Sequence, residues 1–252
     1  MYKLVANEKS NPTAVMLSHI SPIKDILNAI KSADVIVNKI GIRDYKLLIY
    51  GSVTKDVNYT SMCIDLIQTL NLNQNVSIMG LGNGPKVLNN GWIFLNSSVS
   101  EGLPLALGEA GLAGLPVVCT DVGGSIDIVQ DDEGIVYGAY CAPNNPVDLA
   151  YAQIKVLGMY DGLHEYIIRG DKMVNNSKWN PLDLTPASIT QRMYEMIDSR
   201  RELGFRYRNH VLKHFNMSRY LFEHNQILNI SDLKSKQKRI SKRRIPEVVL
   251  SI

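Results

Sequence analysis

The sequence predicts an α/β fold in which a single Rossmann-like parallel sheet is flanked by helices and followed by further C-terminal helices. Two observations predict this class. Short apolar runs alternate along the chain with longer segments whose apolar residues recur at helical spacing. The short runs are also continuously apolar, which is typical of strands buried on both faces of a parallel sheet.

The individual elements follow from the same two patterns, taken in chain order. Six apolar runs are predicted to be strands: 14–17, 45–51, 76–80, 91–96, 115–120 and 134–137. Helices are predicted over 22–30, 61–70, 104–114 and 146–157, and then over 189–203 and 205–228. The helix over 104–114 has Pro near its first turn and Gly at its end, which is the usual arrangement. Residues 160–187 have no regular pattern.

Composition divides the chain into four segments. We expect a leader over 1–13, the Rossmann-like domain over 14–187, C-terminal helices over 188–230 and a basic, disordered tail over 231–252. The tail has seven Lys or Arg and two Asp or Glu, whereas the remaining residues have 20 and 22. The body is therefore slightly acidic, which argues against nucleic-acid binding. A solvated tail is the favoured interpretation, and the alternative is that the basic run 234–244 contacts an acidic membrane surface or nucleic acid.

Composition also bears on the compartment. The chain has 252 residues, of which 45% are hydrophobic and 20% charged, values typical of a globular protein with a sizeable core. No apolar run is long enough for a transmembrane helix, and the first residues do not resemble a signal peptide. The three cysteines are widely spaced and show neither a disulfide framework nor metal spacing. We therefore expect a cytoplasmic protein.

The segment over residues 96–124 carries the clearest chemistry. It reads as the end of a strand, a polar loop, a helix, a second strand and a loop with Gly123 and Gly124. Ligands of open parallel sheets bind outside the carboxyl ends of the strands, where both loops fall. Backbone N–H groups at the helix start and the helix dipole would form an anion site suited to a diphosphate. Those amides belong to Gly102, Leu103, Leu105 and Ala106.

Two glutamates of this segment can face one pocket. Glu101 precedes the helix and Glu109 lies about one turn inside it. A glutamate among Leu, Ala and Gly is expected to accept hydrogen bonds, and sugar hydroxyls would donate them. The alternative is that Glu101 caps the helix and Glu109 accepts from a nearby backbone N–H. The pattern by itself leaves both interpretations open.

The run Glu101-Gly-Leu-Pro-Leu-Ala-Leu-Gly-Glu109, followed by residues 114–124, resembles the Glu-x7-Glu signature of the retaining family-4 glycosyltransferases. The resemblance extends from about residue 15 to residue 228 and is specific over 96–124. It implies the GT-B architecture, in which two Rossmann-like domains face each other across a cleft, and within it the C-terminal, donor-binding domain. Three phrases resemble the fungal branch related to Pel-type exopolysaccharide synthases: 22–25, 91–98 and 200–204.

The resemblance implies a role for each matching residue. Glu109 would accept from the ribose hydroxyls of a nucleotide, and Glu101 would contact the donor sugar. The amides of 102–105 would hold the sugar and the distal phosphate. Lys24 would neutralise the diphosphate leaving group, which lowers the barrier because charge builds there as the glycosidic bond breaks. The implied substrate is a nucleoside diphosphate sugar, with a UDP-sugar as the expected donor and with no cofactor and no metal.

The sequence departs from the family pattern in two ways. His19 stands where the family usually has an Arg, five positions before Lys24, and an imidazole lacks the bidentate guanidinium fork. His19 either contacts phosphate or bonds to the backbone at a strand end. The acceptor-binding N-terminal domain has no counterpart in the chain, so we expect it to come from a partner chain or from a longer protein.

The resemblance therefore implies a donor-binding glycosyltransferase domain that transfers a hexose to a glycan hydroxyl with retention. The alternatives are a non-catalytic nucleotide-sugar-binding module or degenerate remnant and, on weaker grounds, a GT-B sugar-nucleotide epimerase. Other polar residues receive structural interpretations. Asp121 and Asp127 are expected to form turns or caps, and His210 and His214 to lie on a solvated helix face rather than bind metal.

Overall fold

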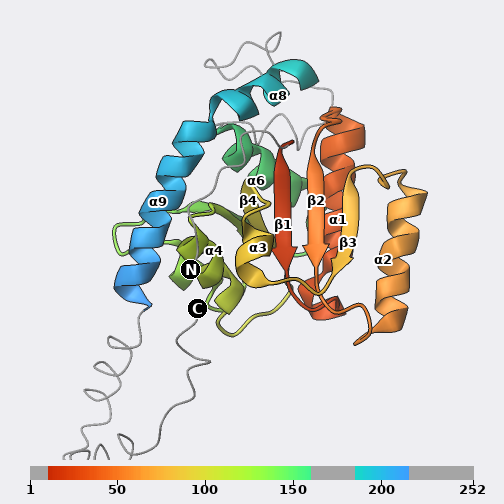
Figure 1. The fold of residues 1–252 in the computed structure, drawn as a ribbon, viewed down its shortest axis with the longest axis horizontal. Helices are drawn as coiled ribbons and strands as arrows, with labels where there is room; N and C mark the ends of the chain where they lie inside the picture. The colour runs from red at the N-terminus through yellow and green to blue at the C-terminus, as the bar shows by residue number, and fades with distance from the viewer. Residues whose placement is uncertain (1–10, 160–184, 216–252) are drawn as a thin grey trace, which may run out of the picture.

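The computed structural model describes residues 11–159 and 185–215, and their centre is a six-stranded sheet in which every neighbouring pair is parallel (Figure 1). The strand order is β3-β2-β1-β4-β5-β6. The strands are β1 (Thr13–Leu17), β2 (Lys46–Tyr50), β3 (Val76–Gly80), β4 (Ile93–Asn96), β5 (Val117–Thr120) and β6 (Gly138–Cys141). The chain builds outward from β1 to β3 and then returns to place β4 on the other side of β1. The predicted α/β fold with one parallel sheet is confirmed.

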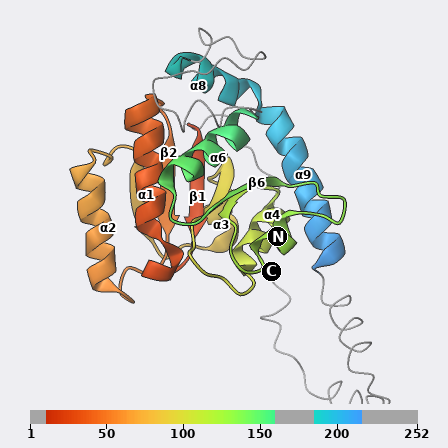
Figure 2. The same cartoon turned by 180° about the vertical axis from the view of Figure 1, so that it is seen from behind.

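Helices cover both faces of this sheet, as the two opposite views show (Figures 1 and 2). One face packs against α1 (Ile26–Asp34), α2 (Val57–Thr69), α6 (Pro146–Gly158) and α8 (Pro186–Glu195). The other packs against α3 (Gly84–Leu88), α4 (Leu105–Ala113), α5 (Ser125–Val129) and α9 (Ile197–His214). Strand β1 alternates between them: Ala14 and Met16 lie in the first core and Val15 in the second. This alternation explains why the strand reads as a continuous apolar run.

The helix expected over 22–30 is divided into two elements. A 3-10 turn, η1 (Pro22–Lys24), ends at Asp25, whose φ of 44° is left-handed. Helix α1 then begins at Ile26, with the Asp25 carboxylate accepting from the backbone N–H of Asn28 at 3.3 Å. A π-helical turn, η2 (Val35–Ile40), continues α1. The break sets the direction of the chain at Lys24, immediately before α1.

The prediction of a strand over 134–137 is wrong, because the sixth strand begins at Gly138. Residues 134–137 have only an isolated antiparallel bridge between Gln130 and Val136, and the Asp131 carboxylate accepts from the Ile135 N–H at 2.8 Å and from the Tyr137 hydroxyl at 2.8 Å. A Cβ at Gly138 would lie 1.8 Å from the Val117 carbonyl oxygen, so the strand can approach β5 only with glycine there. The apolar run thus belongs to the approach to the strand.

The C-terminal helices are predicted correctly in kind but not in their boundary. The break lies at Met196 rather than at Gly204, and the expected domain boundary at 188 falls inside α8. Gly204 lies inside α9, and the position requires glycine because a Cβ there would lie 1.8 Å from the Gly114 carbonyl oxygen at the end of α4. Tyr207 anchors the same contact by donating to the Leu107 carbonyl at 2.9 Å. Helix α9 is therefore docked on α4, the helix of the predicted site.

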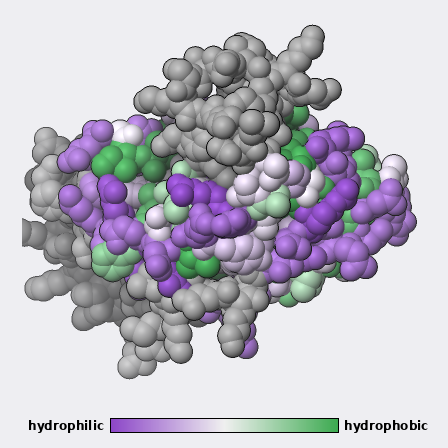
Figure 3. All heavy atoms as spheres, turned by 90° about the horizontal axis from the view of Figure 1, so that it is seen from above, coloured by the Kyte–Doolittle hydropathy of each residue, from purple (hydrophilic) through white to green (hydrophobic). Residues whose placement is uncertain are grey.

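The predictions for the leader before residue 11, for 160–184 and for everything after 215, including the basic tail, lie outside the described residues. Among the described helices, none combines the length and apolarity that a membrane crossing requires. Figure 3 shows the end of the molecule seen from above Figure 1, where hydrophilic side chains separate small groups of hydrophobic ones.

Candidate functional site

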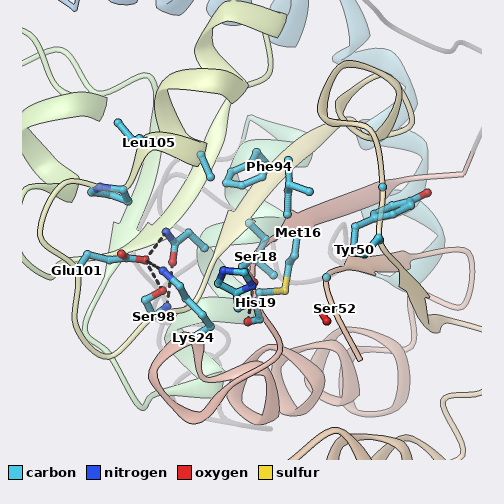
Figure 4. Close-up of a pocket in the computed structure, with 18 of the residues that line it drawn as sticks. Met16, Ser18, His19, Lys24, Tyr50, Ser52, Phe94, Ser98, Glu101 and Leu105 are labelled. Atoms are coloured by element: carbon cyan, nitrogen blue, oxygen red, sulfur yellow. Dashed lines mark hydrogen bonds and ion pairs between the residues drawn. The ribbon is translucent and has the colours of Figure 1, made fainter. Parts of the chain in front are cut away.

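A cavity of about 360 Å³ opens at the carboxyl ends of the central strands (Figure 4). Its walls come from the ends of β1, β2 and β4, from the loop after β3 and from the first turn of α4. The order of the sheet reverses between β1 and β4, and such switch points are where open α/β sheets bind ligands. The predicted position of the site therefore coincides with a real cavity.

An ion pair between Lys24 and Glu101 forms part of this cavity wall (Figure 4). The Lys24 Nζ donates to Glu101 Oε1 at 2.7 Å, and the two side chains are 23% and 9% exposed. The same oxygen accepts from the Ser98 hydroxyl at 2.6 Å and from the Asn96 amide at 3.3 Å. Three donors, from η1, the end of β4 and the loop after β4, thus converge on one carboxylate oxygen.

These contacts determine the charge state of Glu101. Burial would raise the pKa of its carboxyl, but the hydrogen bonds from Lys24, Ser98 and Asn96 and the positive charge of Lys24 together hold the pKa below its usual value. Glu101 is therefore a carboxylate at neutral pH. A carboxylate with one heavily bonded oxygen still has acceptor capacity for a ligand hydroxyl.

The loop that carries Glu101 is held by contacts with neighbouring segments on both sides. The Ser97 hydroxyl donates to the carbonyls of Lys24 and Asp25 at 2.8 and 3.0 Å, which joins this loop to η1. On the other side, the Gly124 N–H donates to the Gly102 carbonyl at 2.8 Å. A Cβ at Gly123, where φ is +53°, would lie 1.8 Å from the Glu101 carbonyl oxygen. The Gly-Gly loop therefore packs directly against the backbone of Glu101 and Gly102.

The first turn of α4 offers backbone donors to the cavity. Pro104 occupies the N-cap position and has neither an N–H nor a side-chain cap bond. The next two residues, Leu105 and Ala106, begin the helix and line the cavity. Amides of a first helical turn have no partner within the helix, and the helix dipole makes their surroundings favourable for an anion. This turn is suited to phosphate binding.

The structure brings together six of the residues predicted for the site and places four others outside the cavity wall. The wall includes His19, Lys24, Glu101, Leu103, Leu105 and Ala106, whereas Glu109, Gly102, Gly123 and Gly124 are not part of it.

Glu109 is half-buried in α4, one turn beyond the cavity wall. Burial raises the pKa of its carboxyl, and nothing among the described residues lowers it. A half-buried carboxyl without such compensation is suited to accept hydrogen bonds from a ligand.

The sequence analysis did not single out Asn96 and Ser98, two polar residues of the cavity wall, or Lys55, which lies outside the wall beside His19. Asn96 and Ser98 stand at the carboxyl end of β4, a position that could have identified them. Lys55 lies after β2 in a loop that carries no motif, and its Nζ is 3.3 Å from the Nε2 of His19. Nothing in the sequence indicates that pairing.

The polar residues set aside from the site lie elsewhere. Asp127 is in the first turn of α5, consistent with the expected helix-start role. The solvated face expected for His210 is wrong: this side chain is 7% exposed, stacks on His214 and packs at a tilt against Tyr137, with ring centroids 4.7 and 5.0 Å away. The described residues contain no group of three His, Cys, Asp or Glu side chains that could hold a metal ion.

Comparison with known proteins finds similarity both to a curated protein sequence and to solved structures. A curated relative, an uncharacterized glycosyltransferase of Methanocaldococcus jannaschii, is 32% identical over 138 residues, which are 53% of this chain and 34% of the relative. Among solved structures, a glycosyltransferase from Rickettsia africae superposes with a TM-score of 0.54 at 19% identity, over 88% of this chain and 49% of that one. TarM superposes with a TM-score of 0.59 at 20% identity, over 91% of this chain and 37% of TarM.

A third solved structure, HepE from Anabaena in complex with UDP-glucose, superposes with a TM-score of 0.52 at 17% identity, over 82% of this chain and 49% of HepE. These similarities show a shared Rossmann-like fold. The chain spans about a third of the curated relative and at most about half of each of these solved structures. The family model described as "Glycosyl transferases group 1" matches residues 3–173, more than half of the chain. The protein therefore belongs to the group 1 glycosyltransferases.

Proposed function

We propose that this chain is the C-terminal, donor-binding domain of a retaining GT-B glycosyltransferase of family 4, in the fungal branch related to Pel-type synthases. The observation that carries the proposal is the Lys24–Glu101 pair, held at 2.7 Å beside the first turn of α4. The cavity places a cation, a carboxylate and unpaired helix amides within one site. A nucleoside diphosphate sugar presents the matching groups, namely phosphate oxygens and sugar hydroxyls.

Each residue has a defined role in this proposal. Lys24 and the amides of Leu105 and Ala106 bind the diphosphate, and Glu101 accepts from hydroxyls of the donor sugar. Glu109 accepts from the ribose, which accounts for a half-buried carboxyl whose raised pKa nothing else compensates. In the reaction, the bond from the anomeric carbon to the phosphate oxygen breaks, and the negative charge that develops on the leaving diphosphate is stabilised by the cation and the amides.

UDP is the nucleotide we propose, because HepE, which shares the fold, was solved with UDP-glucose. The acceptor is proposed to be a glycan hydroxyl presented by protein segments beyond these 252 residues, in the same or another chain. A cytoplasmic location stays a prediction from the cysteine usage.

A second candidate is a nucleotide-sugar-binding module without transferase activity. One observation favours it: Lys24 and Glu101 neutralise each other, and an imidazole rather than a guanidinium stands at position 19. Stabilisation of the leaving group would then be too weak for catalysis, although the donor would still bind.

Calorimetric titration with UDP, GDP and UDP-glucose tests donor binding. We expect UDP to bind, Lys24→Met to weaken it, and Lys39→Met, which removes an exposed lysine outside the cavity, to leave it unchanged. Absence of binding at millimolar UDP would refute the donor site. Release of glucose from UDP-glucose, or transfer with retained anomeric configuration, supports the transferase. Binding without either reaction supports the module.

A further inference from the structure

We propose that Lys55 is a second phosphate-binding residue of this site and that His19 positions it. The inference rests on the proposed donor site and adds a specific residue that neither the motif nor the cavity wall contains. Lys55 lies in the loop between β2 and α2, and its Nζ is 3.3 Å from His19 Nε2. His19 itself lines the cavity, where Figure 4 shows it on the same side as Lys24.

The charge balance of the cavity is the first argument for Lys55. The charged side chains of the cavity wall are Lys24 and Glu101, and these two pair with each other. The formal charge of that pair is zero, whereas a nucleoside diphosphate carries about two to three negative charges near neutral pH. A site that binds this anion is expected to supply a further cation. Lys55 can supply it, because no carboxylate of the described residues forms an ion pair with its ammonium.

The second argument is that the carboxylate next to Lys55 in the sequence, that of Asp56, bonds to the start of α2 and not to Lys55. Asp56 directly follows Lys55, but its carboxylate accepts from the Tyr59 N–H at 2.9 Å and caps α2. The Asp56 carbonyl also accepts from the Thr60 hydroxyl at 2.7 Å. On the other side of Lys55, the hydroxyls of Ser52 and Thr54 are 3.2 Å apart. These contacts order the loop on both sides of Lys55 and keep the Asp56 charge at the helix.

The third argument concerns what His19 does for Lys55. An unprotonated ring nitrogen accepts one hydrogen bond from an ammonium, which leaves two of the three N–H groups of Lys55 for phosphate oxygens. A lysine side chain is flexible, so a fixed acceptor at the cavity wall reduces the freedom lost on binding the ligand. His19 therefore acts as a positioning residue and Lys55 as the group that touches the diphosphate.

The test compares the binding of UDP and UMP by calorimetry in the wild type, Lys55→Gln, Lys55→Arg, His19→Ala and the double variant His19→Ala/Lys55→Gln. Lys39→Gln is the control variant, because it also removes one lysine charge, from an exposed side chain whose ion pair with Asp34 is long at 3.9 Å. We expect Lys55→Gln to weaken UDP about fivefold and UMP about twofold or less, because the distal phosphate is the one contacted. Lys55→Arg retains the affinity, and raising the salt concentration reduces the difference.

The positioning role predicts non-additivity. His19→Ala weakens UDP about twofold, and the double variant binds no more weakly than Lys55→Gln, because His19 acts through Lys55. Independent additive losses would overturn the positioning role. Unchanged UDP binding in Lys55→Gln, together with weakened binding in Lys24→Met, would overturn the role of Lys55 and leave the donor site standing. Wild-type protein that fails to bind UDP would overturn both.

Discussion

Replacing Glu101 with Gln should lower stability and raise the affinity for UDP at the same time. The variant keeps acceptors for the bonds from Ser98 and Asn96 but removes the charge that Lys24 pairs with at 2.7 Å. At an effective dielectric constant of about 20, this pair has a gross attraction of about 6 kcal/mol. Desolvation of both groups offsets most of that attraction.

The net loss can be bounded from the exposure of the pair. Breaking a fully buried pair costs about 3–5 kcal/mol, and an exposed pair contributes below about 1 kcal/mol. Since Lys24 retains 23% exposure and can turn to solvent, we expect a loss of about 2 kcal/mol in the free energy of unfolding. For a protein of this size, the melting temperature should fall by about 4–8 °C.

The gain in affinity follows from the same change in charge. Without the Glu101 carboxylate, the Lys24 ammonium is free to meet the diphosphate, and UDP should bind about three- to fivefold more tightly. Chemical denaturation and calorimetric titration measure the two effects. Glu202→Gln, which removes an exposed acid from α9, is the matched control. A variant as stable as the wild type, with unchanged UDP affinity, would refute the reasoning.

The stability difference should also depend on pH. Because the folded pKa of Glu101 lies below its ordinary value of 4.5, the carboxylate stabilises the fold above that pH. The contribution is lost as pH falls through the folded pKa. The difference between the wild type and Glu101→Gln should therefore be full above about pH 6 and should shrink below about pH 4.5. A difference that stays constant between pH 7 and pH 3.5 would contradict the pairing.

Three further changes are predicted. Glu109→Gln should retain or raise stability at pH 7, because burial raises the pKa of Glu109 and penalises its charged form. The same variant should bind UDP more weakly, by about threefold or more. Thermal melts measure the stability, and calorimetric titration measures the affinity. Gly123→Ala should destabilise the protein by about 1–3 kcal/mol and weaken UDP binding, since the new Cβ would strike the Glu101 carbonyl; wild-type values for both would contradict this. His210→Phe should lose less stability on acidification than the wild type does. Burial lowers the pKa of His210, so the neutral ring stabilises the wild-type fold, and this contribution is lost as pH falls below about 6.5. Thermal melts from pH 7.5 to 5 test the prediction.

The sequence predicted well where a single local pattern determined the structure. Five strands appear where apolar runs were found, because a strand buried on both faces must be apolar throughout. Pro at the start of α4 and Gly at its end located the helix of the site within one residue. The Glu-x7-Glu spacing likewise predicted that this loop and helix belong to the site, and they form one wall of the cavity.

The sequence failed where a contact between distant segments decided the outcome. Gly138 opens β6 where β5 approaches closely, and Gly204 lies where α9 contacts the end of α4, so both glycines serve contacts between distant segments. The left-handed conformation of Asp25, which directs Lys24 toward Glu101, is supported by the Ser97 hydroxyl 72 residues away. Lys55 was missed for the same reason, since its partner His19 is 36 residues distant.

The central claim is that a nucleoside diphosphate binds between the end of β1 and the first turn of α4. Amide hydrogen exchange of the wild-type protein, measured with and without saturating UDP, tests it most directly. We predict slower exchange in the segments 18–25 and 96–107, and unchanged exchange in α2 and α9. Unchanged exchange in both cavity segments, or protection confined to other helices, would contradict the account.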